Sequence, residues 1–209
     1  MAEIYLVRHG ETVANVAHRF DSTLPGAPLT ERGQRQAQLV AQWFSERDIF
    51  LDFLLSSPFR RTRQTAAPLH AATARPVLLC DLLREVDLGS WDGHPSEEFR
   101  NDQTFLRWLR DPEVAPPGGE RLSDVTARLG LVLEAVERLA PAATCALFSH
   151  ELMLCASLVL CGQGRDATGH LVHLPNASVV HLHRRNGLLE MRCLDRSISS
   201  IEGLGRAAI

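Results

Sequence analysis

The sequence predicts an α/β fold, specifically a three-layer α/β/α sandwich around a mainly parallel central sheet. Short apolar runs of strand length alternate along the chain with longer segments whose apolar residues recur at helical spacing. This alternation is typical of strand–helix–strand units that build a parallel sheet. The chain has 209 residues, 45% of them hydrophobic and 22% charged. That is enough for one core, so we expect a single domain over residues 1–209.

Six short apolar runs are the expected strands. The first runs straight into Arg8, His9 and Gly10, where Gly10 would suit a sharp exit that brings backbone close to a ligand. The six runs are Ile4–Val7, Phe53–Leu55, Val77–Leu79, Cys145–Phe148, Val179–His183 and Leu188–Cys193.

Five segments between the strands are expected to be helical. Thr30 can cap a helix over 31–47, because Ala37, Val40 and Phe44 then fall on one face. The segment that follows His150 is apolar on nearly all sides, which predicts a buried helix that ends at Gly162. The other three helical segments are Phe59–His70, Glu97–Arg110 and Leu122–Leu139.

A lid-like insertion is expected around residues 93–119, which include most of the loop sequence DPEVAPPGGE. It would cover a pocket with aromatic and cationic side chains. An equally weighted alternative is that the aromatics simply pack on the core. The candidates are Phe99, Phe105, Leu106, Trp108, Arg100, Arg107 and Arg110.

Composition argues against several partner classes. The net charge is -3 and no basic block occurs, so neither nucleic acid nor an anionic membrane surface is an expected partner. No apolar run approaches the ~20 residues that span a bilayer, and no signal peptide is visible. The five cysteines are scattered and form no CxxC pair. We expect reduced thiols and a cytoplasmic protein.

Chemically active side chains follow three of the expected strands. Arg8 and His9 follow the first, Ser56-Ser57 and the sequence PFRRTRQTA follow the second, and Ser149 and His150 follow the run TCALF. Ligands of open α/β sheets bind beyond the carboxyl ends of strands. These side chains could therefore converge on one pocket.

Their chemistry suits a phosphoryl group. The planar guanidinium of arginine matches phosphate oxygens, and a histidine beside it could attack phosphorus. An acid that protonates the leaving oxygen would come from LLREVDLGSWDG, where spacing alone does not choose among Glu85, Asp87 and Asp92. Taken singly, the arginines at 60, 61 and 63 could form a solvated helix face, and His150 could be a core histidine.

The joint order of the motifs resembles the histidine phosphatase superfamily, the phosphoglycerate-mutase-like group. The motifs span residues 4 to about 183, nearly the whole chain. They are LVRHGET with Asn15, LTERGQRQA, SSPFRRTRQTA, LREVDLGSWDG, PGGE, FSH and LPNASV.

The resemblance implies a role for each matching residue. His9 would be the nucleophile, Glu85 the acid that then activates water, and His150 a second, protonated pocket histidine. Phosphate would be bound by Arg8 and by Arg61 rather than Arg60. Asn15 would join them at the entrance, which the backbone near Ser22 and Thr23 also lines. Asn176 would orient backbone near the pocket. The resemblance implies no metal and no cofactor.

The sequence departs from the family pattern at three positions. Glu151 follows His150 where the family commonly has glycine, Ala14 replaces a bulkier residue, and Ser22 stands where glycine is frequent. Glu151 would either face the pocket and repel acidic substrates, or point away at a helix start, where the macrodipole favours it.

The expected function is hydrolysis of a small phosphorylated metabolite through a phosphohistidine. The alternative is a phosphoglycerate mutase-type phosphoryl transferase, but Glu85 and His150 are only 65 positions apart, which leaves no room for the long insertion of true mutases. A third hypothesis is a catalytically idle binding module. A homodimer is left open. His181 and His183 share a strand face, where a polar sheet surface is favoured over a metal site.

Overall fold

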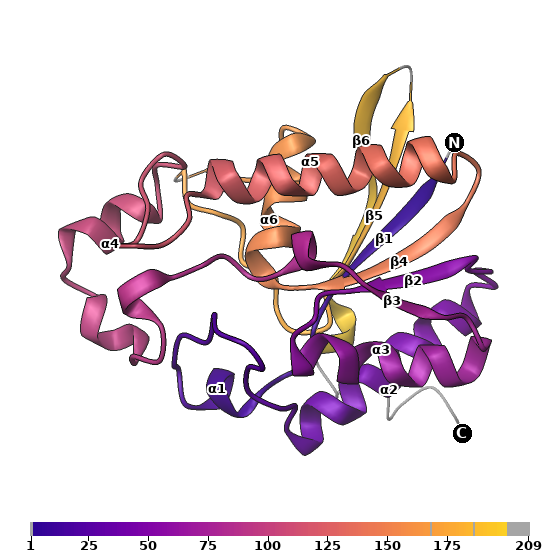
Figure 1. Cartoon of the computed structure of the whole chain (residues 1–209), viewed down its shortest axis with the longest axis horizontal. Helices are drawn as coiled ribbons and strands as arrows, with labels where there is room; N and C mark the ends of the chain where they lie inside the picture. Colours follow the sequence, from indigo (N-terminus) through magenta and orange to yellow (C-terminus); the bar gives the residue numbers. More distant parts are fainter. Residues whose placement is uncertain (1, 168, 186, 200–209) are drawn as a thin grey trace.

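The computed structural model describes residues 2–167, 169–185 and 187–199 and has the predicted three layers (Figure 1). Its sheet has the order β3-β2-β4-β1-β5-β6. The strands β3, β2, β4 and β1 are mutually parallel. In contrast, β5 runs antiparallel to β1, and β6 runs antiparallel to β5. The strands are β1 (Glu3–Arg8), β2 (Phe53–Ser56), β3 (Val77–Leu79), β4 (Thr144–Ser149), β5 (Val179–Arg185) and β6 (Leu188–Asp195).

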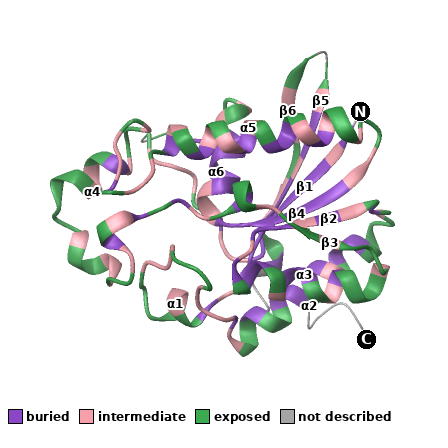
Figure 2. Ribbon diagram, viewed as in Figure 1, coloured by how far each residue is buried: buried purple, intermediate pink, exposed green. Residues whose placement is uncertain are grey.

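The helices cover both faces of the sheet, because alternate residues of the central strands point to opposite sides. Ile4 and Leu6 of β1 pack toward α5 and α6, whereas Tyr5 and Val7 pack toward α2 and α3. Figure 2 shows the central strands buried between these helices, whose outer faces are exposed. The helices are α1 (Val13–Val16), α2 (Glu31–Glu46), α3 (Arg60–Thr73), α4 (Gln103–Trp108), α5 (Leu122–Leu139) and α6 (Glu151–Leu160).

Local sequence explains where the helices begin and end. The Thr30 side chain accepts a hydrogen bond from the Gly33 amide at 3.0 Å and so caps α2, as predicted. Gly162, in the left-handed region at φ 73°, follows the end of α6. None of the helices in the described residues has the length and apolar content to cross a membrane.

The expected helix over 97–110 is wrong, because the structure divides this segment in two. A 3-10 turn, Ser96–Phe99, is followed by a break, and α4 then begins afresh at Gln103. The cause is Asp102, whose carboxylate accepts from the Phe105 amide at 2.8 Å and caps a new helix. Three further 3-10 turns are Asp81–Leu83, Gly89–Trp91 and Ser197–Ser199.

Gly10 is needed for a reason other than the expected one. A Cβ at Gly10 would lie 2.5 Å from the Gly33 carbonyl oxygen, and one at Gly33 would lie 2.0 Å from the Glu11 carbonyl oxygen. The chain that leaves β1 therefore lies directly against the first turn of α2, and only glycine fits at either contact. This contact supports the backbone next to His9.

Candidate active site

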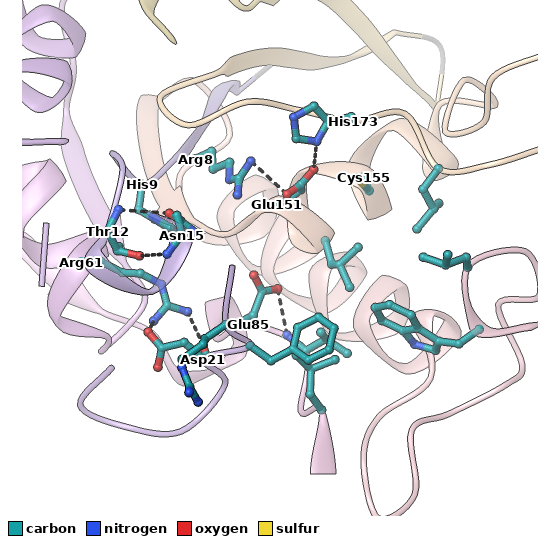
Figure 3. Close-up of a pocket in the computed structure, with 18 of the residues that line it drawn as sticks. Arg8, His9, Thr12, Asn15, Asp21, Arg61, Glu85, Glu151, Cys155 and His173 are labelled. Carbon is teal, nitrogen blue, oxygen red and sulfur yellow. Dashed lines mark hydrogen bonds and ion pairs between the residues drawn. The ribbon is translucent and has the colours of Figure 1, made fainter. Parts of the chain in front are cut away.

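Parallel pairing brings two of the expected residues to one edge of the sheet. Arg8 pairs with Ser149 in the register of β1 and β4, so His9 and His150 leave the sheet side by side. Their rings lie 5.4 Å apart between centroids. Arg61 reaches the same edge from the first turn of α3, which follows β2. Figure 3 shows the resulting pocket, a cavity of about 350 Å³ that Arg8, His9, Arg61 and Glu85 line.

His9 is held with its Nε2 atom unprotonated when the ring is neutral. The side chain is buried, and its Nδ1 donates a hydrogen bond to the Gly10 carbonyl oxygen at 2.8 Å. Burial, followed by the nearby charges of Arg61 and Arg8, holds the pKa of His9 well below its ordinary value. The ring is therefore a neutral imidazole with a lone pair on Nε2, which is the form required of a nucleophile.

Each of the two site arginines already has an anionic partner. Arg8 Nη1 lies 2.9 Å from Glu151 Oε2, and the same nitrogen donates to the Leu174 carbonyl. Arg61 Nη1 lies 3.1 Å from Asp21 Oδ2, while its Nη2 donates to the Asp21 carbonyl at 2.9 Å. Arg8 Nε is buried and has no hydrogen-bond partner among the described residues, which leaves a charged donor for an anionic oxygen.

The structure separates the three arginines of PFRRTRQTA. Arg61 is buried and lines the cavity, whereas Arg60 and Arg63 are exposed on the outer side of α3. The helix period accounts for this, because neighbouring residues on a helix point in different directions. The solvated-face interpretation therefore applies to Arg60 and Arg63 but not to Arg61.

Among the three acidic candidates, Glu85 lies in the cavity. Its side chain is 14% exposed, and its Oε1 accepts from the Val86 amide at 3.0 Å. Burial raises the pKa of Glu85, against the opposing influence of Arg61. Asp87 is exposed and accepts from the Gly89 amide, while Asp92 accepts from the Ser22 hydroxyl at 2.9 Å. Glu85 is thus a carboxyl group disposed to carry a proton inside the cavity.

His150 lies behind the cavity and is fully buried. Its Nδ1 accepts from Arg61 Nε at 3.2 Å, and its Nε2 donates to the Ser57 hydroxyl at 2.9 Å. Burial and the charge of Arg61 hold the pKa of His150 well below its ordinary value. Both observations describe a neutral ring, which differs from the protonated His150 expected from the resemblance. The cause is that the nitrogen that would take the proton already accepts from Arg61.

Glu151 combines parts of the two alternatives considered for it. It is the first residue of α6, and its carboxylate lies at the cavity wall, bound to Arg8 rather than unpaired. The same carboxylate accepts from His173 Nδ1 at 2.6 Å and from the Leu174 amide at 3.2 Å. Burial alone would raise the pKa of Glu151, but the bond from His173 and the charge of Arg8 bring it below its ordinary value. Glu151 therefore stays charged and offsets Arg8.

Asn15 and Asn176 form a small network beside His9. Asn176 Nδ2 donates to the His9 carbonyl and to Asn15 Oδ1, both at 3.1 Å. Asn15 Oδ1 also accepts from the Thr12 amide at 3.1 Å, and Asn15 lines the cavity. Asn176 thus orients the backbone at His9, as expected. Its contact with Asn15 links the LPNASV motif to the segment that follows LVRHGET.

Sequence reasoning missed several residues of the site, among them Asp21 and His173. Both line the cavity and hold a charged partner there, Arg61 and Glu151 respectively. No local pattern marks Asp21, since its role comes from the chain folding back onto α3. His173 lies close to the LPNASV motif, and this proximity was the signal available.

The two histidines of β5 have separate partners. His181 Nε2 lies 2.5 Å from Glu3 Oε2, and His183 Nε2 lies 3.5 Å from Glu190 Oε2. In the part of the chain that the structure describes, no group of three or more potential ligands is placed to hold a metal ion. This face of the sheet therefore carries polar contacts between histidine and glutamate side chains.

Comparisons with known proteins agree on one family. The family model described as the histidine phosphatase superfamily (branch 1) matches residues 4–195. Phosphoserine phosphatase 1 of Hydrogenobacter thermophilus is 36% identical over 165 residues, 76% of this chain and 77% of that protein. A protein named probable phosphoglycerate mutase GpmB, from Cronobacter sakazakii, is 32% identical over 157 residues, 74% of this chain and 72% of that protein. A solved mycobacterial glucosyl-3-phosphoglycerate phosphatase in complex with VO3 has a TM-score of 0.79 and 31% identity, covering 95% of this chain and 99% of that one.

Proposed function

The chain belongs to the histidine phosphatase superfamily, and from that premise we propose that it hydrolyses a small phosphate monoester through a phosphohistidine at His9. One observation carries the proposal. A neutral imidazole with a free Nε2 lies in the same cavity as two arginines and a carboxyl group whose pKa is raised. Nucleophile, anion-binding groups and general acid are the three functions that this reaction needs.

In the first step, the phosphate group binds to Arg8, Arg61 and Asn15. His9 Nε2 attacks phosphorus, and a P–N bond forms as the bond to the leaving oxygen breaks. Glu85 gives its proton to that oxygen, so the alcohol leaves uncharged. The two guanidinium groups offset the charge on the phosphoryl oxygens as it shifts.

In the second step, water attacks the phosphohistidine. Glu85, now a carboxylate, takes a proton from the water as the P–N bond breaks. The products are inorganic phosphate and a neutral His9, and Glu85 regains its proton. We propose that His150 acts through Arg61, because its Nδ1 holds Arg61 Nε in place.

Hydrolysis is favoured over phosphoryl transfer between phosphoglycerates. A mutase must bind a substrate that carries a carboxylate beside the phosphate. Of the described residues that line the cavity, three are arginines, and Arg8 and Arg61 are both paired with acidic side chains. The third, Arg19, donates to the Gly93 carbonyl at 2.5 Å. The relative named as a probable mutase keeps the alternative open to test.

The test is phosphate release from a panel of phosphate monoesters, with and without EDTA. We expect activity that EDTA leaves unchanged, because Arg8 and Arg61 supply the positive charge. The His9→Ala variant is the control and should be inactive. Activity that is lost in EDTA and restored by a divalent ion would contradict the proposal, as would wild-type activity in His9→Ala.

Three wider properties complete the proposal. Residues 1–209 would form one domain, of which 1, 168, 186 and 200–209 lie outside the described residues, and 93–119 would act as a lid over the cavity. This is supported by Phe105 and Trp108, which belong to that segment and line the cavity. A cytoplasmic location is supported by the cysteines, each of which is a free thiol, as is usual in a reducing compartment.

We propose that the protein pairs with a second copy of itself at the β3 edge of the sheet. Among the described residues, β3 has one strand neighbour, β2, which leaves its outer edge open in that part of the chain. Leu78, Leu79, Leu131 and Leu139 are 52%, 59%, 57% and 77% exposed around a groove between β3 and α5. An apolar sheet edge can be covered by the same edge of another copy across a two-fold axis.

A further inference from the structure

The cavity has two chemically different parts. The charged residues of the proposed reaction occupy one of them, and Figure 3 shows the labelled charged side chains gathered there. The remaining wall extends away from the strand ends and is apolar except for the indole N–H of Trp108, which is buried without a hydrogen-bond partner among the described residues. It is formed mainly by Phe20, Phe105, Trp108, Leu109, Leu171 and Val172.

This apolar wall is anchored in the core. The rings of Phe105 and Trp108 lie 5.5 Å and 5.7 Å from Trp91, which is 3% exposed, and Phe20 packs on Phe105 at 6.0 Å. The aromatic residues of the lid segment therefore fulfil both expected roles in part, packing on the core and covering the pocket. The same rings pack together and present a surface to the cavity, which a ligand meets beside the phosphate site.

Of the described cationic side chains that line the cavity, Arg19 alone has no carboxylate partner, and it is exposed. Arg8, Arg61 and His173 each contact a carboxylate, and Arg19 donates to a backbone carbonyl. The arginines of the lid segment, at 100, 107 and 110, do not line the cavity. In contrast, three carboxyl groups do line it, those of Asp21, Glu85 and Glu151.

We propose that the alcohol part of the substrate is apolar and carries no second anionic group. The substrate class is then a phosphate monoester of an alkyl or arylalkyl alcohol. This inference rests on the proposed function of the same site. The phosphate would lie at Arg8 and Arg61, and the carbon chain would lie along Phe105 and Leu109. A carboxylate on that chain would meet apolar rings and like charges, which disfavour its binding.

The experiment compares kcat/KM for ethyl, butyl and hexyl phosphate. Their leaving alcohols are alike in acidity, so the chemical step should be the same along the series. Each buried methylene should raise kcat/KM about fourfold, which makes hexyl phosphate, with four more methylenes, roughly 250-fold better than ethyl phosphate. Phosphoserine and 3-phosphoglycerate should both be poorer substrates than butyl phosphate. A flat series, or a higher kcat/KM for either acidic substrate, would overturn the inference.

A matched pair of variants locates the effect. Phe105→Ala should lower kcat/KM for hexyl phosphate at least tenfold more than for ethyl phosphate. Leu106→Ala, the next residue of α4 and not part of the cavity lining, should leave the series as in the wild type. Equal losses on both esters in Phe105→Ala would contradict the assigned wall. If the wild type releases phosphate from no ester, nitrophenyl phosphate included, it is the proposed function that fails.

Discussion

The protonation states of His9 and Glu85 are set by their surroundings in opposite directions. Burial and two guanidinium groups keep His9 neutral, and its bond to the Gly10 carbonyl keeps the proton on Nδ1. Burial raises the pKa of Glu85 and so favours its protonated form. A base without its proton and an acid with one thus share a cavity, which is the starting state that phosphoryl transfer to His9 requires.

The Glu85→Gln variant tests the proposed acid. We expect a loss of roughly 10²–10⁴-fold on alkyl phosphates and a much smaller loss on nitrophenyl phosphate, whose leaving group needs little protonation. Asp87→Asn is the control, since Asp87 is exposed and lies outside the cavity lining. Equal losses on both esters would instead indicate a structural role for Glu85.

The pH profile of kcat/KM tests the Glu85→Gln variant in a second way. Activity should fall as pH rises through the raised pKa of Glu85, because the acid loses its proton. It should also fall as pH drops through the lowered pKa of His9, because the nucleophile gains one. Glu85→Gln should lose the alkaline limb. The substrate's own second ionisation, near pH ~6, is common to both enzymes and does not affect the comparison.

Glu151 is expected to limit how tightly phosphate binds. At an effective dielectric of about 20, two unit charges roughly 6 Å apart repel by about 3 kcal/mol, which solvent and salt reduce. Glu151→Gln should therefore lower the inhibition constant of inorganic phosphate about tenfold, most clearly at low salt. Glu137→Gln is the matched control, because Glu137 pairs with Arg184 at 2.9 Å away from the cavity. An unchanged or higher inhibition constant in Glu151→Gln would show that the pairing with Arg8 fully offsets this charge.

At the scale of the elements, the contact between α2 and the chain after β1 supports the site. A Cβ at Gly33 would lie 2.0 Å from the Glu11 carbonyl oxygen, two residues beyond His9. Gly33→Ala should displace this backbone, lower kcat at least tenfold and destabilise the fold by about 1–3 kcal/mol. Denaturant unfolding and steady-state kinetics measure the two effects.

Gly130→Ala, on α5, is the matched control for Gly33→Ala. Nothing lies within 4 Å of a Cβ built there, and the residue is inside a helix. It should leave kcat unchanged and stabilise the fold by up to about 1 kcal/mol. A Gly33→Ala variant that behaves like Gly130→Ala would contradict the proposed support.

Elements with strong sequence signals were predicted well. The helix over Leu122–Leu139 has the predicted bounds because its apolar face has a regular period. The helix over 97–110 was predicted wrongly, since Asp102 is compatible with a helix interior as well as with a cap, and tertiary packing decides. The positions of the site residues could be anticipated because strand ends converge. Their partners could not, since the pairs of Arg8 with Glu151 and Arg61 with Asp21 join segments far apart in sequence.

At the scale of the whole molecule, the proposed reaction and the proposed association use different parts of the sheet. The carboxyl ends of β1 and β4 lead into the cavity, whereas the proposed contact with a second copy uses the outer edge of β3. The two surfaces use different residues. Association should therefore be separable from activity.

Sedimentation velocity tests the proposed pairing. The wild type should sediment as a dimer, and Leu139→Lys should sediment as a monomer of unchanged activity, because a charge in the apolar groove is costly to bury. Phe50→Lys is the control, since Phe50 is 85% exposed but lies outside the groove. A wild type that is monomeric at every concentration would contradict the pairing.

His9 should carry the phosphoryl group during turnover, and trapping the phosphorylated enzyme is the most direct measurement of this. Wild-type enzyme mixed with nitrophenyl phosphate is quenched in alkaline denaturant, digested and analysed by mass spectrometry. We expect a phosphate that is stable in base and labile in acid on the peptide that contains His9, and none in His9→Ala. A phosphate found instead on a serine or a carboxylate, or turnover that persists in His9→Ala, would contradict the claim.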